Sequence, residues 1–202
     1  MNAEVRTFAP LTDAERSELL QIARATIRAA LQGQAAATNW ASTPSLDQPA
    51  AVFVSLHQNG RLRGCIGSMT ADRPLCEAVA RMAVSAALDD PRFPPLSEPE
   101  LSATAIEISR LSPLTPAAPE QLCPGRHGVY LANGTSHAVF LPQVARQQRW
   151  DRETLLSELC LKALLPPEAW KQPGTTLMLF EAEVFADEDG AGASPASSGH
   201  GP

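Results

Sequence analysis

One cysteine has neighbours that could support thiol chemistry. Cys65 lies in the segment Arg61-Leu-Arg-Gly-Cys-Ile-Gly-Ser68, with a glycine on each side that leaves room for close approach to the sulfur or the backbone. In a regular strand Arg61, Arg63 and Cys65 would share one face, because side chains alternate with period two. A guanidinium beside a thiol favours the thiolate, which is the reactive form. The segment therefore predicts a reactive cysteine.

The same pattern has a plain structural interpretation. Cysteine is often a small buried apolar residue, and glycines in a strand often mark a bulge where a sheet bends. The sequence alone leaves both interpretations open.

The cysteine spacing gives little support for a metal site. Cys65, Cys76, Cys123 and Cys160 form no Cys-x-x-Cys pair, and no closely spaced histidine pair accompanies them. We therefore predict free thiols and no dedicated metal site, although a site assembled from distant residues such as Cys65 and His127 stays open.

Length and composition favour one globular domain. The chain has 202 residues, of which 44% are hydrophobic and 19% charged, with a formal net charge of -6. The acidic balance and the lack of a basic stripe argue against nucleic-acid binding. No apolar run is long enough to span a membrane, and the N-terminus does not resemble a signal peptide, so we expect a cytoplasmic protein without a membrane partner.

Local signals predict an α+β fold with an internal repeat. A capping box at Thr12-Asp-Ala-Glu15 opens a helix that ends near Gly33. Two β-hairpins are expected around Asn59-Gly60 and Asn133-Gly134, each followed by a helix, the first from near Pro74 and the second after Asp151. We expect these duplicated hairpin-helix units to form a mixed or antiparallel sheet flanked by helices. A two-residue first turn would place Cys65 opposite Val54 and Arg63 opposite Leu56.

The rest of the chain sets the expected boundaries. Residues 89–95 form a proline-rich loop, and strands are expected over 103–111 and 176–185. The tail is rich in Gly, Ala, Ser and Pro and has too little apolar surface to fold. We predict a flexible N-terminus at 1–11, a domain at 12–186 and a disordered tail at 187–202.

The order of several motifs resembles that of the AMMECR-type domain family, also called AmmeMemoRadiSam system protein A. The resemblance runs from about Thr12 to Phe185 and rests on these segments: Leu62-Arg-Gly-Cys-Ile-Gly67, Asp90-Pro-Arg-Phe-Pro-Pro-Leu96, Glu107-Ile-Ser-Arg-Leu-Ser112, Pro124-Gly-Arg-His-Gly128 and Phe140-Leu-Pro-Gln-Val144.

The resemblance implies a single α+β fold and a biochemical role that is not settled. It implies membership of a modification pathway shared with Memo-like and radical SAM proteins, and it does not identify a cofactor. The family's signature falls on Arg63, Gly64, Cys65, Ile66 and Gly67, and its other recurrent polar positions fall on Arg92 and His127.

Two functions compete at these residues. In a thiol-dependent enzyme Cys65 would be the nucleophile and His127 its base, while Arg63 or Arg92 would hold an anionic group and Gly64, Ile66 and Gly67 would shape the site. In a non-catalytic binding or scaffold module, the same segment would form a groove for a small molecule, a peptide or a pathway protein. His127 near the sulfur would favour the enzyme, whereas a sulfur sealed in apolar contacts would exclude it. Nucleotide binding is a weaker third reading, because neither a dinucleotide fingerprint nor a P-loop is present.

Overall fold

The chain divides into two compact units. The computed structural model describes residues 8–35, 40 and 43–187. Unit 1 comprises the described parts of residues 1–110 and 183–202, and unit 2 comprises residues 111–182. Most of the predicted N-terminal segment, and the tail after Asp187, lie outside the described residues.

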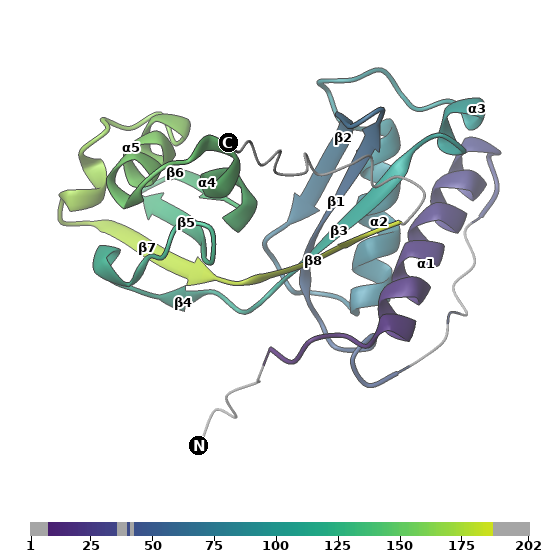
Figure 1. The fold of residues 1–202 in the computed structure, drawn as a ribbon, viewed down its shortest axis with the longest axis horizontal. Helices are drawn as coiled ribbons and strands as arrows, with labels where there is room; N and C mark the ends of the chain where they lie inside the picture. Colours follow the sequence, from purple (N-terminus) through teal and green to yellow (C-terminus); the bar gives the residue numbers. More distant parts are fainter. Residues whose placement is uncertain (1–7, 36–39, 41–42, 188–202) are drawn as a thin grey trace, which may run out of the picture. The chain divides into compact units, whose positions relative to one another are not determined.

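Unit 1 contains a sheet and the two longest helices (Figure 1). Its helices are α1 (Asp13–Leu31), α2 (Leu75–Leu88) and the short α3 (Glu98–Leu101). The strands run in the order β2-β1-β3-β8, where β1 is Ala51–Gln58, β2 is Arg61–Ser68, β3 is Ala105–Leu111 and β8 is Ala182–Ala186. This order places β2 at one edge of the sheet.

Period-two alternation explains the core of unit 1. Val52, Val54 and Leu56 are alternate residues of β1, and all three are fully buried with Ile106 and Ile108 of β3 and the apolar faces of α1 and α2. Each such side chain contributes about 1.5–3 kcal/mol when it leaves water. One face of the sheet therefore packs against the helices.

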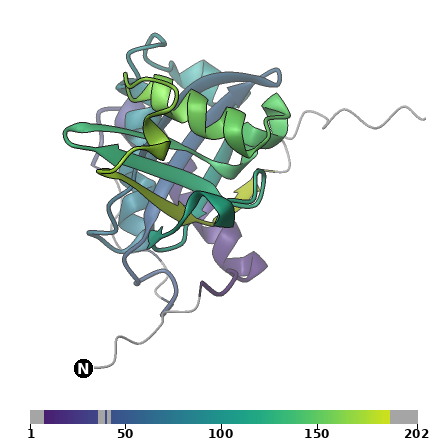
Figure 2. The ribbon, with the colours of Figure 1, turned by 90° about the vertical axis from the view of Figure 1, so that its left-hand side faces the viewer.

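Unit 2 also combines a four-stranded sheet with helices, and its strands are shorter on average. Its strands run in the order β4-β7-β5-β6, with neighbouring strands antiparallel. They are β4 (Thr115–Pro116), β5 (Gly128–Asn133), β6 (Ser136–Phe140) and β7 (Thr175–Phe180). Helices α4 (Pro142–Gln148) and α5 (Arg152–Lys162) follow the hairpin, and two 3₁₀ turns span Pro119–Gln121 and Ala169–Lys171. Figure 2 shows α5 in green beside these strands.

The α+β class is confirmed, and so are several local predictions. Thr12 and Glu15 form the predicted capping box of α1, and Asp151 caps α5 through the amide of Thr154. Asn59 and Gly60 both have positive φ, as a type I′ turn requires. No helix in the described parts of the chain is long and apolar enough to cross a membrane.

The sheet arrangement differs from the expectation in two ways. The strands form two four-stranded sheets in the described residues, where we expected one. The last strand, predicted over 176–185, is interrupted at Glu181, so its halves β7 and β8 belong to different sheets. The backbone of Glu181 bonds instead to Ser112, whose N–H donates to the Glu181 carbonyl at 2.9 Å.

The second hairpin also turns one residue later than predicted. Asn133 pairs with Ser136, which makes Gly134 and Thr135 the turn residues. Gly134 has φ 58°. A glycine at the first central position is typical of the type II′ turn.

Candidate active site around Cys65

A β-bulge changes the register of the signature strand. Leu56 pairs with Gly64 and His57 with Leu62, which leaves Arg63 without a partner on β1. Cys65 therefore lies opposite Ser55, and the predicted pairings with Val54 and Leu56 are wrong by one residue. The extra residue also breaks the alternation, so Arg61, which pairs with Gln58, does not share a face with Cys65.

The sulfur of Cys65 lies outside the apolar core. Its partner Ser55 alternates with the core residues Val54 and Leu56, so Ser55 and Cys65 belong to the opposite face of the sheet. The Ser55 hydroxyl donates a hydrogen bond to Sγ of Cys65 at 3.3 Å. Cys65 is half-buried, and Ile66 packs against the core on the other face. The thiol thus has a polar partner.

Asp90 and Arg92 bind the backbone N–H and the backbone carbonyl of Cys65. Oδ2 of Asp90 accepts the Cys65 N–H at 2.8 Å, and Nη2 of Arg92 donates to the Cys65 carbonyl at 3.0 Å. Because β2 is an edge strand, these outward groups would otherwise be open to water or to another strand. The loop after α2 therefore closes the sheet edge at the cysteine.

The two clamping residues are also bound to each other. Oδ1 of Asp90 accepts from the backbone N–H and Nε of Arg92 at 3.1 and 2.9 Å, and Nη2 of Arg92 lies 2.7 Å from Oδ2. The Asp90 side chain is 2% exposed, whereas that of Arg92 is 56% exposed. These hydrogen bonds from Arg92 hold the pKa of Asp90 well below its usual range, so the clamp carries a buried carboxylate.

The guanidinium of Arg92 also interacts with the cysteine side chain. Hydrogen bonding to Asp90 is the main reason that the pKa of Arg92 is raised, and the charge of the Cys65 side chain makes a smaller contribution in the same direction. Arg92 thus places a positive charge close to Cys65.

Arg63 is bound elsewhere. Its Nη1 and Nη2 donate to the carbonyls of Pro94 and Pro95 at 2.8 and 3.3 Å, and its Nε donates to Glu100 at 3.3 Å. Hydrogen bonds from Ser97, with a further contribution from Arg63, lower the pKa of Glu100 to about 2. Arg63 thus ties the bulge of β2 to the proline-rich loop and to α3.

The two glycines of the signature are required by packing. A Cβ on Gly64 would collide with the carbonyl oxygen of Ala86, near the end of α2. A Cβ on Gly67 would overlap the ring of Phe53, its partner on β1. Gly64 lets a helix approach the strand, and Gly67 lets an aromatic ring lie over it.

His127 belongs to unit 2, so its pairing with Cys65 stays a prediction. Its Nδ1 accepts a hydrogen bond from the backbone N–H of Cys123 at 3.2 Å, and the backbone N–H of His127 donates to the Cys123 carbonyl at 3.0 Å. Within its own unit, His127 closes the turn that precedes β5.

Two members of the site were missed by the sequence interpretation: Ser55 and Asp90. Asp90 carried a local signal, because an aspartate often accepts a hydrogen bond from the amide two residues later, as here from Arg92. The role of Ser55 depends on the bulge. In the described residues no group of three His, Cys, Asp or Glu side chains could hold a metal ion, and all four cysteines are free.

The sequence and the fold match known proteins along most of the chain. The family model described as AMMECR1 matches residues 20–185. A protein from Methanothermobacter thermautotrophicus is 37% identical over 191 residues, covering 91% of this chain and 99% of its own length. Protein MK0488 from Methanopyrus kandleri is 38% identical, covering 90% of this chain and 93% of its own. The crystal structure of uncharacterized protein PH0010 from Pyrococcus horikoshii matches with a TM-score of 0.81 and 35% identity, covering 86% of this chain and 92% of that one.

Proposed function

Because this chain belongs to the AMMECR1 family, and its segment Arg63-Gly-Cys-Ile-Gly67 resembles the signature of that family, we propose that it is a thiol-dependent protein in which Cys65 supplies the reactive group. One observation carries this proposal. The sulfur lies on the face of the sheet away from the helical core and accepts a hydrogen bond from the Ser55 hydroxyl, while the Arg92 guanidinium binds the carbonyl of the same cysteine.

The surroundings of the sulfur suit a thiolate. A hydroxyl donor and a guanidinium both interact more strongly with S⁻ than with the neutral thiol. The clamp formed by Asp90 and Arg92 fixes both backbone groups of Cys65. Such fixation places the sulfur before a substrate arrives, which lowers the entropic cost of an attack.

A base for this chemistry is proposed in His127. The hydrogen-bond partner of the sulfur is a serine, whose hydroxyl is a poor proton acceptor at neutral pH. His127 is the base in this proposal because it falls on a recurrent polar position of the family that the chain resembles. We expect His127→Gln to slow a Cys65-dependent reaction while the urea unfolding curve shifts only slightly.

A second candidate function is a non-catalytic binding or scaffold module. It is favoured by the engagement of Arg63, whose guanidinium is already bound to Glu100 and to two proline carbonyls and so is not available to hold an anionic substrate. In this alternative the signature segment shapes a groove for a small molecule or a peptide. Memo-like and radical SAM proteins are proposed pathway partners in either case.

The thiol proposal can be tested by alkylation kinetics. We expect iodoacetamide to react with Cys65 at neutral pH several-fold more slowly in Arg92→Gln and Ser55→Ala than in the natural protein, since each variant removes a group that stabilises the thiolate. Cys123 is exposed and serves as an internal control whose rate should stay constant. Equal Cys65 rates in all three proteins would contradict the proposal and favour the binding module.

A further inference from the structure

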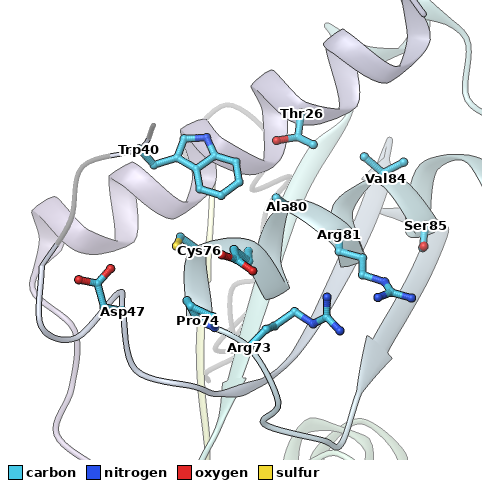
Figure 3. Close-up of a pocket in the computed structure, with 11 residues that line it drawn as sticks. Thr26, Trp40, Asp47, Arg73, Pro74, Cys76, Ala80, Arg81, Val84 and Ser85 are labelled. Atoms are coloured by element: carbon cyan, nitrogen blue, oxygen red, sulfur yellow. The ribbon is translucent and has the colours of Figure 1, made fainter. Parts of the chain in front are cut away.

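A separate pocket lies in unit 1 between α1 and α2. It has a volume of about 780 Å³. This is within the range of roughly 300–1,000 Å³ that is typical of small-molecule sites. Neither Cys65 nor its hydrogen-bond partners Ser55, Asp90 and Arg92 line this pocket, so it is separate from the proposed thiol site. Figure 3 shows Thr26 of α1 on one side and residues of α2 on the other.

One end of the pocket is apolar and aromatic. The indole of Trp40 is half-buried and packs against the core of unit 1. Cys76 and Ala80 are one helical turn apart on α2 and line this end, and Val84 continues the apolar lining toward Arg81 (Figure 3). Burial raises the pKa of Cys76, so this thiol is neutral and adds to the apolar lining. This end suits a ring or a branched alkyl group.

The other end carries two guanidinium groups. In Figure 3 Arg73 and Arg81 point to the same side of the pocket, away from Trp40. Arg73 donates to Asp72 through Nε and Nη2 at 3.1 Å. The side chain of Arg81 is exposed and makes no hydrogen bond or ion pair with residues 8–35, 40 and 43–187, although its charge helps to lower the pKa of Asp72. An arginine of this kind is available to bind a planar anion.

Two carboxylates limit the kind of anion that fits. Asp47 and Glu77 also line the pocket, so the lining carries as many formal negative charges as positive ones. A doubly charged phosphate would be repelled by them, whereas a single carboxylate matches the fork of one arginine.

We propose that this pocket binds a small monocarboxylate with an apolar ring or branched alkyl group, its carboxylate at Arg81 and its apolar part against Trp40. The proposal combines the pocket, the apolar face of α2 and the available arginine. It does not depend on the chemistry of Cys65.

The three tryptophans of the chain allow a direct test by NMR. Trp40 lines the pocket, whereas Trp150 and Trp170 belong to unit 2 and serve as internal controls. The indole N–H signals of ¹⁵N-labelled protein would be followed during titration with 3-phenylpropionate and with its neutral amide, and Trp40→Phe would assign the signal. We expect a saturable shift of the Trp40 signal alone, with the amide binding about tenfold more weakly because it lacks the charge-assisted contact to arginine.

Two variants test the role of the arginine. We expect Arg81→Gln to weaken 3-phenylpropionate binding about tenfold and to leave the affinity of the amide nearly unchanged. Arg28→Gln is the matched control, since Arg28 is an exposed helix arginine that does not line the pocket. A Trp40 signal that does not saturate, equal affinity for acid and amide, or an Arg81→Gln protein that binds like the natural one would each overturn the proposal.

Discussion

Replacing Asp90 by Asn is expected to destabilise unit 1 by about 2–3 kcal/mol. The buried carboxylate accepts hydrogen bonds from the Cys65 amide and from three N–H groups of Arg92. The amide of asparagine keeps one acceptor oxygen and turns an NH₂ group toward the donors on the other side. Hydrogen bonds to charged groups are worth about 1.5–3 kcal/mol each. The total loss of about 2–3 kcal/mol is smaller than the sum over all of these bonds, because the exposed Arg92 side chain can bind water instead.

Urea unfolding followed by circular dichroism measures this loss. With a slope of roughly 2 kcal/mol per molar urea, the midpoint should fall by about 1 M. Asp89→Asn is the matched control, because the neighbouring Asp89 is exposed, and we expect a change within about 0.5 kcal/mol. If Asp90→Asn and Asp89→Asn unfold at the same urea concentration, the clamp does not stabilise the fold and the reasoning is refuted.

The same clamp predicts a dependence of stability on pH. The folded-state pKa of Asp90 lies below the unfolded value, so the folded protein binds fewer protons at this group. The contribution of the Asp90 carboxylate to the free energy of unfolding is therefore complete at neutral pH. It declines as the pH falls below about 3.9, the usual pKa of aspartate, and is lost once the pH falls through the folded-state pKa. The difference in free energy of unfolding between the natural protein and Asp90→Asn should shrink accordingly in acid.

Three further variants test the packing and the helix start. Gly64→Ala should be strongly destabilised, because its Cβ meets the backbone carbonyl of Ala86, which cannot rotate away; thermal melting should show a much lower midpoint or an insoluble protein. Gly67→Ala should lose less, because the ring of Phe53 can shift, and an equal loss in both variants would contradict this comparison. Thr12→Ala should lower the free energy of unfolding by about 1 kcal/mol through loss of the cap of α1, as measured by urea unfolding; no loss would mean that the capping box contributes nothing.

Local chemistry made much of the fold predictable. The capping box at Thr12, the Asn59-Gly60 turn and the cap at Asp151 depend on residues a few positions apart, and each is present.

Features set by distant contacts could not be predicted in the same way. The bulge at Arg63 coincides with contacts to Glu100, Pro94 and Ala86, the last through Gly64, and all lie more than twenty residues away in sequence. A one-residue slip then exchanged the expected partner of Cys65 for Ser55. The division into two sheets likewise depends on the interruption of the last strand at Glu181, where the sequence has no glycine or proline that would predict a turn.

The contacts of the candidate site could not be predicted from the segments that contain it. Arg92, which we expected to hold an anionic group, donates to the backbone carbonyl of Cys65 and to the carboxylate of Asp90. The clamping role of Asp90 required the loop after α2 to fold against an edge strand, which no single-sequence pattern describes.

The reactivity of Cys65 tests the central claim most directly. Mass spectrometry of the folded protein, alkylated over a range of pH, reports all four cysteines at once, with the buried Cys76 and Cys160, whose pKa values are raised by burial, as unreactive references. We predict that Cys65 is labelled selectively below pH ~8.5, the usual pKa of a free thiol. If Cys65 is labelled only when the protein unfolds, together with Cys76 and Cys160, the signature is structural and the thiol-dependent function is contradicted.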